Sequence, residues 1–227
     1  MRDKFTLSGG QSAKLEIAIE RNKGETTDVE WLCAGDNFGS VIQLARGLAE
    51  LIIKIKSVLH SLGKVVTVSA TKTKNTVSCF TNETRYYSRD GDLDQYLPKN
   101  QPAQPESKFA VCELTQAATF KEMAEQILGI QGDTKTLAKL LKDRGYTTTL
   151  PAIEALIERQ ENGEDTGLLT NGYANFFFVE NEDRESVSVV DVDRVGRRWG
   201  VFRSSLGGVY GWGIGSLLFV RNFPGTL

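Results

Sequence analysis

Histidine and cysteine are the scarcest chemical groups in this 227-residue sequence, which contains one His and three Cys. A Ser-His or Cys-His catalytic pair would have to use His60, and no nucleophile-elbow motif is present. Cys33, Cys79 and Cys112 lack the C-x-x-C spacing of zinc and redox sites. The composition therefore favours a binding role over conventional nucleophilic or zinc catalysis, and we expect no cofactor.

The sequence also lacks long apolar runs and a strong net charge. Its longest apolar-rich stretch, 41–59, is interrupted by charged residues, which is wrong for a membrane span. The N-terminus has no apolar core of signal-peptide length, and an odd number of scattered cysteines is typical of a reducing compartment. Lys and Arg total 27 against 29 Asp and Glu. We therefore expect a cytoplasmic, soluble protein without a membrane partner.

Proline is rare as well, and its distribution predicts a domain boundary. Three of the five prolines fall within 98–107, a short polar stretch. Proline stiffens the chain and cannot donate a hydrogen bond to a sheet, so this stretch is predicted to be a linker. It would divide an N-terminal domain, 1–97, from a C-terminal domain, 108–227.

The N-terminal domain opens with strand patterns and continues with a long apolar helix. Apolar and polar residues alternate over 14–20, and 29–33 is predicted to be its partner strand. A helix is predicted over 39–61, with an apolar face that spans more than half of its circumference. Such a face must be covered on two sides, by the sheet and by either the other domain or a second copy of the chain. Strand patterns follow at 64–70, 76–81 and 85–87.

The C-terminal domain opens with helices and ends with strands. Amphipathic helices are predicted at 120–128, 134–144 and 151–160. Strands are predicted at 174–180, 186–193, 198–203 and 216–221. The predicted fold is α+β with two small domains. The N-terminal domain is an antiparallel sheet with one long helix, and the C-terminal domain is a three-helix unit followed by an antiparallel β meander.

One stretch of the N-terminal domain has the composition of a nucleic-acid contact. Between 64 and 89 there are several basic residues and one acidic residue, Glu83, and aromatic residues are interleaved. A basic sheet face with aromatic side chains can follow a phosphate backbone and stack unpaired bases. We therefore expect a non-catalytic binding protein that contacts nucleic acid through this sheet face, with single-stranded nucleic acid as a candidate ligand. The candidate nucleic-acid-binding residues are Lys72, Lys74, Phe80, Arg85, Tyr86, Tyr87 and Arg89.

A second basic stretch and a glycine-rich stretch add secondary binding candidates. Arginines surround aromatic residues over 194–203, although acidic residues just upstream could neutralise them across strands. Glycines alternate with bulky residues over 207–215, which predicts a hairpin loop whose aromatic residues either form a recognition surface or fold back on the core. The secondary candidates are Arg197, Arg198, Trp199, Arg203, Tyr210 and Trp212.

Two alternatives to nucleic-acid binding stay open. The first is a protein–protein module, such as an assembly component, an inhibitor or an immunity-type partner, for which helix 39–61 is the expected contact or dimer surface. The second is a metal-dependent enzyme built on Asp191 and Asp193, because their spacing puts two carboxylates on one face of a strand. A solvated strand face is the competing interpretation of that pair.

Overall fold

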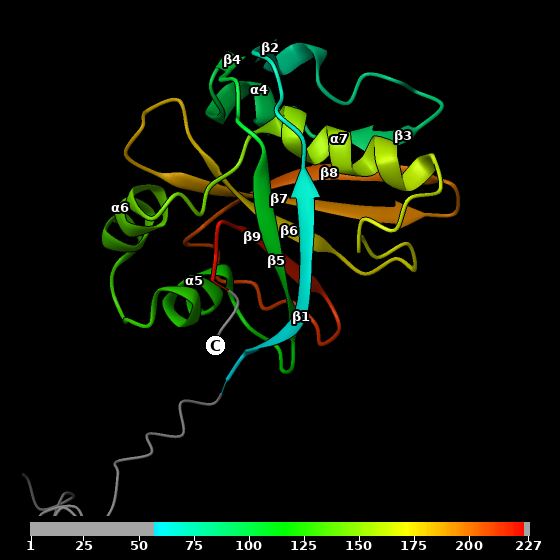
Figure 1. The fold of residues 1–227 in the computed structure, drawn as a ribbon. Helices are drawn as coiled ribbons and strands as arrows, with labels where there is room; N and C mark the ends of the chain where they lie inside the picture. Colours follow the sequence, from blue (N-terminus) through cyan, green and yellow to red (C-terminus); the bar gives the residue numbers. More distant parts are fainter. Residues whose placement is uncertain (1–56, 225–227) are drawn as a thin grey trace, which may run out of the picture. The chain divides into compact units, whose positions relative to one another are not determined.

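The computed structural model of the protein describes residues 57–224, and one seven-stranded mixed sheet organises them (Figure 1). Its strands are β1 (Leu59–Val68), β3 (Tyr86–Arg89), β5 (Ser107–Leu114), β6 (Asn175–Glu180), β7 (Val187–Val195), β8 (Arg198–Ser205) and β9 (Leu217–Arg221). Their spatial order is β1-β5-β9-β6-β7-β8-β3. Neighbouring strands are antiparallel except for two parallel pairs, β9 with β6 and β8 with β3.

The central strand β6 is buried on both faces of the sheet, which explains its nearly continuous apolar sequence. Phe177 and Val179 belong to the hydrophobic core on one face, and Phe176 and Phe178 belong to the core on the other. This division follows from the two-residue period of a strand. Both faces must therefore be covered by other elements.

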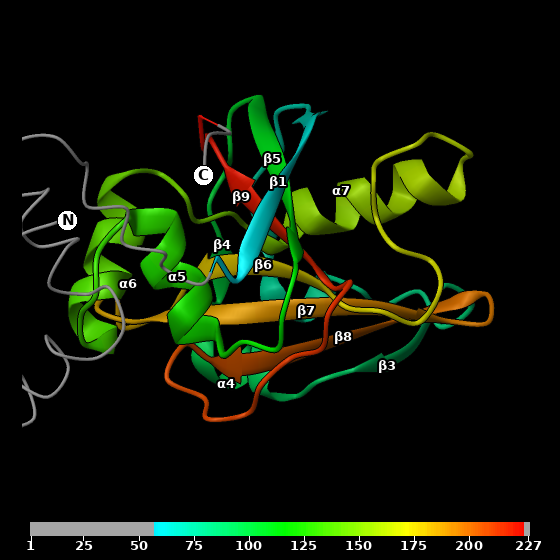
Figure 2. The ribbon, with the colours of Figure 1, turned by 90° about the horizontal axis from the view of Figure 1, so that it is seen from below.

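Helices cover both faces (Figures 1 and 2). Helix α5 (Phe120–Leu128) and helix α6 (Thr134–Asp143) contact each other and supply the core around Phe176. Helix α7 (Leu150–Glu161) supplies the opposite core, around Phe177. The three helices were predicted and are confirmed, but the predicted three-helix unit is wrong. A sheet with two apolar faces needs cover on each, so α7 is separated from the other two helices.

Capping residues fix where these helices begin. Thr119 and Glu122 form a capping box at the start of α5, in which each side chain accepts from the backbone N–H of the other residue. Asp133 accepts from the backbone N–H of Thr136 at 2.8 Å at the start of α6. Gly129 adopts a φ of 70° and ends α5. These signals are local, so the sequence alone located the helices correctly.

The predicted antiparallel meander is wrong because the last strand leaves it. β9 does not pair with β8. It lies between β5 and β6, antiparallel to β5 and parallel to β6. β8 instead pairs with β3, a strand from the predicted N-terminal domain. The strands themselves lie where the sequence predicted them, and long-range contacts decide their partners.

The proline-containing stretch 98–107 packs against the start of α7 and the residues before it. Gln101 and Gln104 are 1% and 3% exposed, and their side-chain carbonyls accept from Leu150 N at 3.1 Å and Thr148 Oγ1 at 3.0 Å. β1 precedes this stretch and β5 follows it, and the two strands pair in antiparallel register. The predicted fold class of two small α+β domains is therefore wrong, because strands from both sides of 98–107 share one sheet.

Several shorter predictions have mixed outcomes. The strands predicted at 64–70 and 85–87 correspond to β1 and β3, although β1 already begins at Leu59. The strand predicted at 76–81 is wrong, because the Asn75 side chain caps a 3-10 helix, η1 (Thr76–Ser78). The remaining short elements are β2 (Lys74–Asn75), α4 (Asp92–Tyr96) and β4 (Asn100–Gln101). Within 57–224 no helix has the length and apolarity to cross a membrane.

The predictions for the first part of the chain lie outside the described residues. These are the strands at 14–20 and 29–33 and most of the apolar helix at 39–61, with the dimer surface assigned to that helix. The helix end is wrong where the structure does describe it, since Leu59–Ser61 form the start of β1.

Candidate functional site

The basic stretch predicted to bind nucleic acid is largely neutralised by carboxylates of α7. Lys74 pairs with Glu154, and Arg85 Nη1 lies 2.7 Å from Glu158 Oε1. Glu154 is itself 9% exposed and also accepts from the backbone N–H of Phe80 at 2.9 Å. Because 154 and 158 are one turn apart, one helix face neutralises two candidate cations.

The other two candidate cations of this stretch differ from each other. Arg89 donates to both carboxylate oxygens of Asp94 in α4, at 2.8 and 2.6 Å, and to the Thr76 carbonyl at 2.9 Å. Lys72 is exposed and forms no ion pair with residues 57–224. Lys72 alone among the four therefore offers an uncompensated positive charge on the described surface.

The aromatic residues of the same stretch are divided between core and surface. Phe80 and Tyr86 are buried, with ring centroids 5.4 Å apart in an edge-to-face contact. Tyr87 faces the other side of β3 and is 36% exposed. The nucleic-acid contact stays a prediction, and in this fold it would depend on Lys72 and Tyr87.

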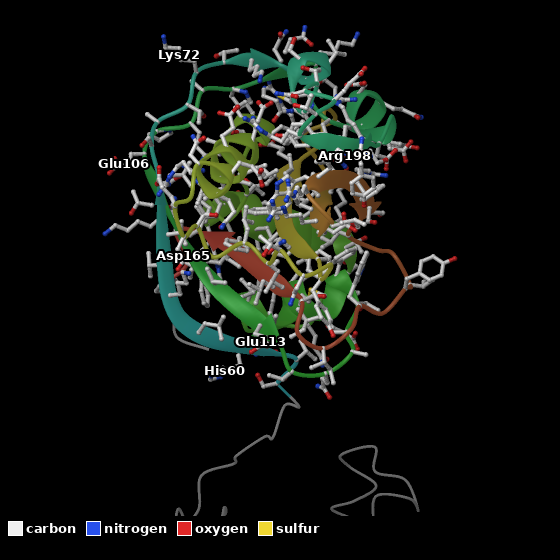
Figure 3. All side chains as sticks on the ribbon, turned by 90° about the vertical axis from the view of Figure 1, so that its right-hand side faces the viewer. His60, Lys72, Glu106, Glu113, Asp165 and Arg198 are labelled. Carbon is white, nitrogen blue, oxygen red and sulfur yellow. The ribbon has the colours of Figure 1, made fainter. Side chains whose placement is uncertain are left out.

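The second basic stretch lies on the β7–β8 hairpin. Arg197 and Arg198 are exposed and form no ion pair with the described part of the chain, and Arg198 lies far from Lys72 (Figure 3). Trp199 is fully buried, and its indole N–H donates to a carboxylate of α7 at 2.9 Å. Arg203 donates to a serine hydroxyl of β7 at 2.7 Å and lies over a tyrosine ring at 4.0 Å. Trp199 and Arg203 therefore stabilise the fold.

The predicted carboxylate pair does form on one face of β7. Asp193 Oδ1 accepts from the Tyr87 hydroxyl at 2.6 Å, and an added Cβ on Gly200 would lie 2.4 Å from that hydroxyl. Asp191 is 5% exposed, and burial, with added repulsion from Asp193 and Asp90, raises its pKa to about 7. In 57–224 no three His, Cys, Asp or Glu side chains lie close enough to hold a metal ion. The metal role stays a prediction.

The glycine-rich stretch, Gly207–Gly215, forms a loop that one residue anchors; we name it the glycine-rich loop. Trp212 N donates to the Ala118 carbonyl at 2.8 Å, and Ala118 N donates back to Trp212 at 3.2 Å. The Trp212 ring packs 5.4 Å from Phe120 and 4.8 Å from Phe176, measured between ring centroids. The anchor therefore fixes the loop to α5 and to the centre of the sheet.

On either side of this anchor the glycine-rich loop exposes its other large side chains. Val209 is 84% exposed, Tyr210 82% and Ile214 62%, the largest values among large apolar residues in the described part of the chain. The sequence identified Tyr210 and Trp212 as candidates but missed Val209 and Ile214. A signal was available in the sequence, since Val209 follows a glycine and Ile214 stands between two glycines in a segment without charged residues.

Comparison with known proteins gives no relative from which a role could be transferred. No family model matches the chain, and neither a curated protein nor a solved structure matches it. A function for this chain is therefore inferred from its own geometry.

Proposed function

We propose that this chain is a binding protein that docks a partner protein through the glycine-rich loop. The observation that carries the proposal is the exposure of Val209 and Tyr210 on a loop in which Trp212, two residues further on, is partly buried and packs against the core. Large apolar side chains exposed together are costly in water and mark interaction surfaces. Loops held by a rigid scaffold commonly carry recognition residues.

The chemistry of the loop favours a protein partner over nucleic acid. No charged residue occurs in Gly207–Gly215, so the loop has no group that could neutralise phosphates. Three of the four cations predicted to contact nucleic acid are paired with carboxylates. Tyrosine and aliphatic side chains that enter a pocket on a partner are typical of protein–protein hot spots. We therefore expect binding that depends little on salt concentration.

The proposal is tested with the full chain and a double variant, Val209→Ser with Tyr210→Ser. The immobilised wild-type chain is used to capture a partner from an extract of its source cells, and the purified partner is then titrated by calorimetry. Loss of a tyrosine hot spot costs on the order of 2 kcal/mol, so the variant should bind at least ~30-fold more weakly. Both side chains are exposed in the free chain, so its thermal stability should not change.

Val195→Ser is the matched control, because Val195 is 59% exposed but lies on β7 rather than on the loop. It should leave partner affinity unchanged. Equal binding by the wild type and the double variant would refute the proposal. Salt-sensitive binding of single-stranded oligonucleotides that the double variant retains would favour the nucleic-acid prediction instead. Sedimentation of the chain alone shows whether the partner is a second copy.

A further inference from the structure

A cavity of about 150 Å³ lies where two parallel strands of the sheet end, and no residue of the glycine-rich loop lines it. β6 ends at Glu180 and its parallel neighbour β9 ends at Arg221, and both residues line the cavity. Thr149, the residue before α7, lines it too. In α/β sheets, ligands bind outside the carboxyl ends of parallel strands and at helix N-termini. This cavity occupies both positions at once.

Arg221 brings a partly buried positive charge to the cavity. No ion pair to Arg221 forms within residues 57–224, and its one hydrogen bond there runs from Nη1 to the Thr147 carbonyl at 3.3 Å. Its Nε is buried and has no acceptor among the described residues. Burial also lowers the pKa of the Arg221 guanidinium. A partly desolvated guanidinium without a counter-ion is unfavourable, and an anion that accepts from this guanidinium would relieve that cost.

Thr149 brings a second donor that the fold leaves unused. It is 8% exposed, and its Oγ1 is buried without a hydrogen-bond partner in the described chain. A threonine at this position ordinarily caps the helix with its hydroxyl. Here the Gln101 side chain accepts from the Leu150 N–H at 3.1 Å, and the Thr149 carbonyl accepts from the Ala152 N–H at 3.1 Å. The buried hydroxyl therefore has no partner in the described chain, and an anion would supply one.

We propose that this cavity binds a small anion through a carboxylate or phosphate group, with Arg221 and Thr149 as the donors. The positive end of the α7 dipole adds a favourable field at the same place. Glu180 lines the cavity as well and forms no ion pair with Arg221, so its negative charge opposes the anion. Affinity is therefore limited by Glu180 and rises when that charge is removed.

The test titrates the full chain with inorganic phosphate and with acetate at constant ionic strength, followed by calorimetry or NMR. Arg221→Gln and Thr149→Val should each weaken binding, by roughly tenfold or more for the arginine. Glu180→Gln should strengthen it about fivefold, a gain that a misfolded variant cannot produce. Arg197→Gln removes the same charge from an exposed position outside the cavity and should have no effect. The tighter probe identifies the ligand group as phosphate or carboxylate.

A purely structural role for Arg221 predicts a different pattern. The Arg221→Gln variant would then lose thermal stability, whereas removal of an unpaired buried charge should leave stability unchanged or raise it when no anion is present. The proposal is overturned if neither probe binds with a Kd below roughly 10 mM. It is also overturned if Glu180→Gln and Arg221→Gln bind the probes as the wild type does.

Discussion

Asp191 makes the stability of the fold depend on pH in a direction that can be calculated. The pKa of its carboxyl rises from 3.8 to about 7 because the group is buried and faces Asp193 and Asp90. The folded chain therefore holds the proton more tightly than the unfolded chain. This contribution to stability is full below about pH 4 and is lost as the pH rises through 7. Three pKa units at 1.36 kcal/mol each set the total loss at about 4 kcal/mol.

We expect Asp191→Asn to stabilise the protein more at pH 8 than at pH 5. Asparagine keeps the shape of the side chain and carries no charge, so it avoids the cost of an ionised, buried carboxylate. Between pH 5 and 7 the wild type loses about 1.4 kcal/mol per pH unit from Asp191. The gain from the substitution should therefore be about 2 to 3 kcal/mol larger at pH 8. Urea denaturation at both pH values measures this difference.

Asp183→Asn is the matched control for the same chemical change. Hydrogen bonds from Ser186 lower the pKa of Asp183 below its usual value. Both assay pH values lie above that pKa, so the contribution of Asp183 is constant between them. Asp183→Asn should shift stability by the same amount at pH 5 and pH 8. If Asp191→Asn also shifts stability equally at the two pH values, the assignment of a raised pKa to Asp191 is refuted.

Two further substitutions test the contacts of Tyr87 in β3 and of Phe80, which follows η1. Gly200→Ala should lower the free energy of unfolding by about 2 to 4 kcal/mol, because a Cβ there would lie 2.4 Å from the Tyr87 hydroxyl and 2.6 Å from Asp193 Oδ1. Glu154→Ala should lower it by about 2 to 4 kcal/mol, because it leaves the buried backbone N–H of Phe80 without an acceptor and removes a partly buried ion-pair partner. Denaturant unfolding measures both.

A second glycine and a second glutamate provide the controls for these two substitutions. A Cβ added at Gly213 would meet no other atom within 4 Å, so Gly213→Ala should change the free energy of unfolding by less than about 0.5 kcal/mol. Glu158 lies one turn from Glu154, and its side chain is 51% exposed, so Glu158→Ala should cost less than about 1 kcal/mol. If either control lowers the free energy of unfolding as much as its matched variant, the assigned contacts do not explain the loss of stability.

The sequence located most local elements because their signals lie within a few residues. The bounds of α5 agree with the prediction, since a capping box and a terminal glycine mark its ends. The shared face of Asp191 and Asp193 also followed from the strand period alone. The strand predicted at 76–81 failed because the Asn75 side chain accepts a hydrogen bond from the Val77 N–H, which favours a helical turn there.

The candidate sites needed the tertiary structure. Tyr210 stood out in the sequence, but its exposure depends on Trp212 packing against Phe176, a contact with another strand. Arg221 and Thr149 carried no sequence signal, because each becomes a candidate only when the ends of β6 and β9 meet the start of α7.

The sequence by itself determined where most of the described helices and strands form and which of their faces are apolar. Only the tertiary structure decided which strands pair and which charges survive at the surface. The basic stretch is the clearest case, because Lys74 and Arg85 are neutralised by Glu154 and Glu158, which lie more than seventy residues away in sequence. Local periodicity and capping act over a few residues, whereas strand order and ion pairing depend on packing between distant segments.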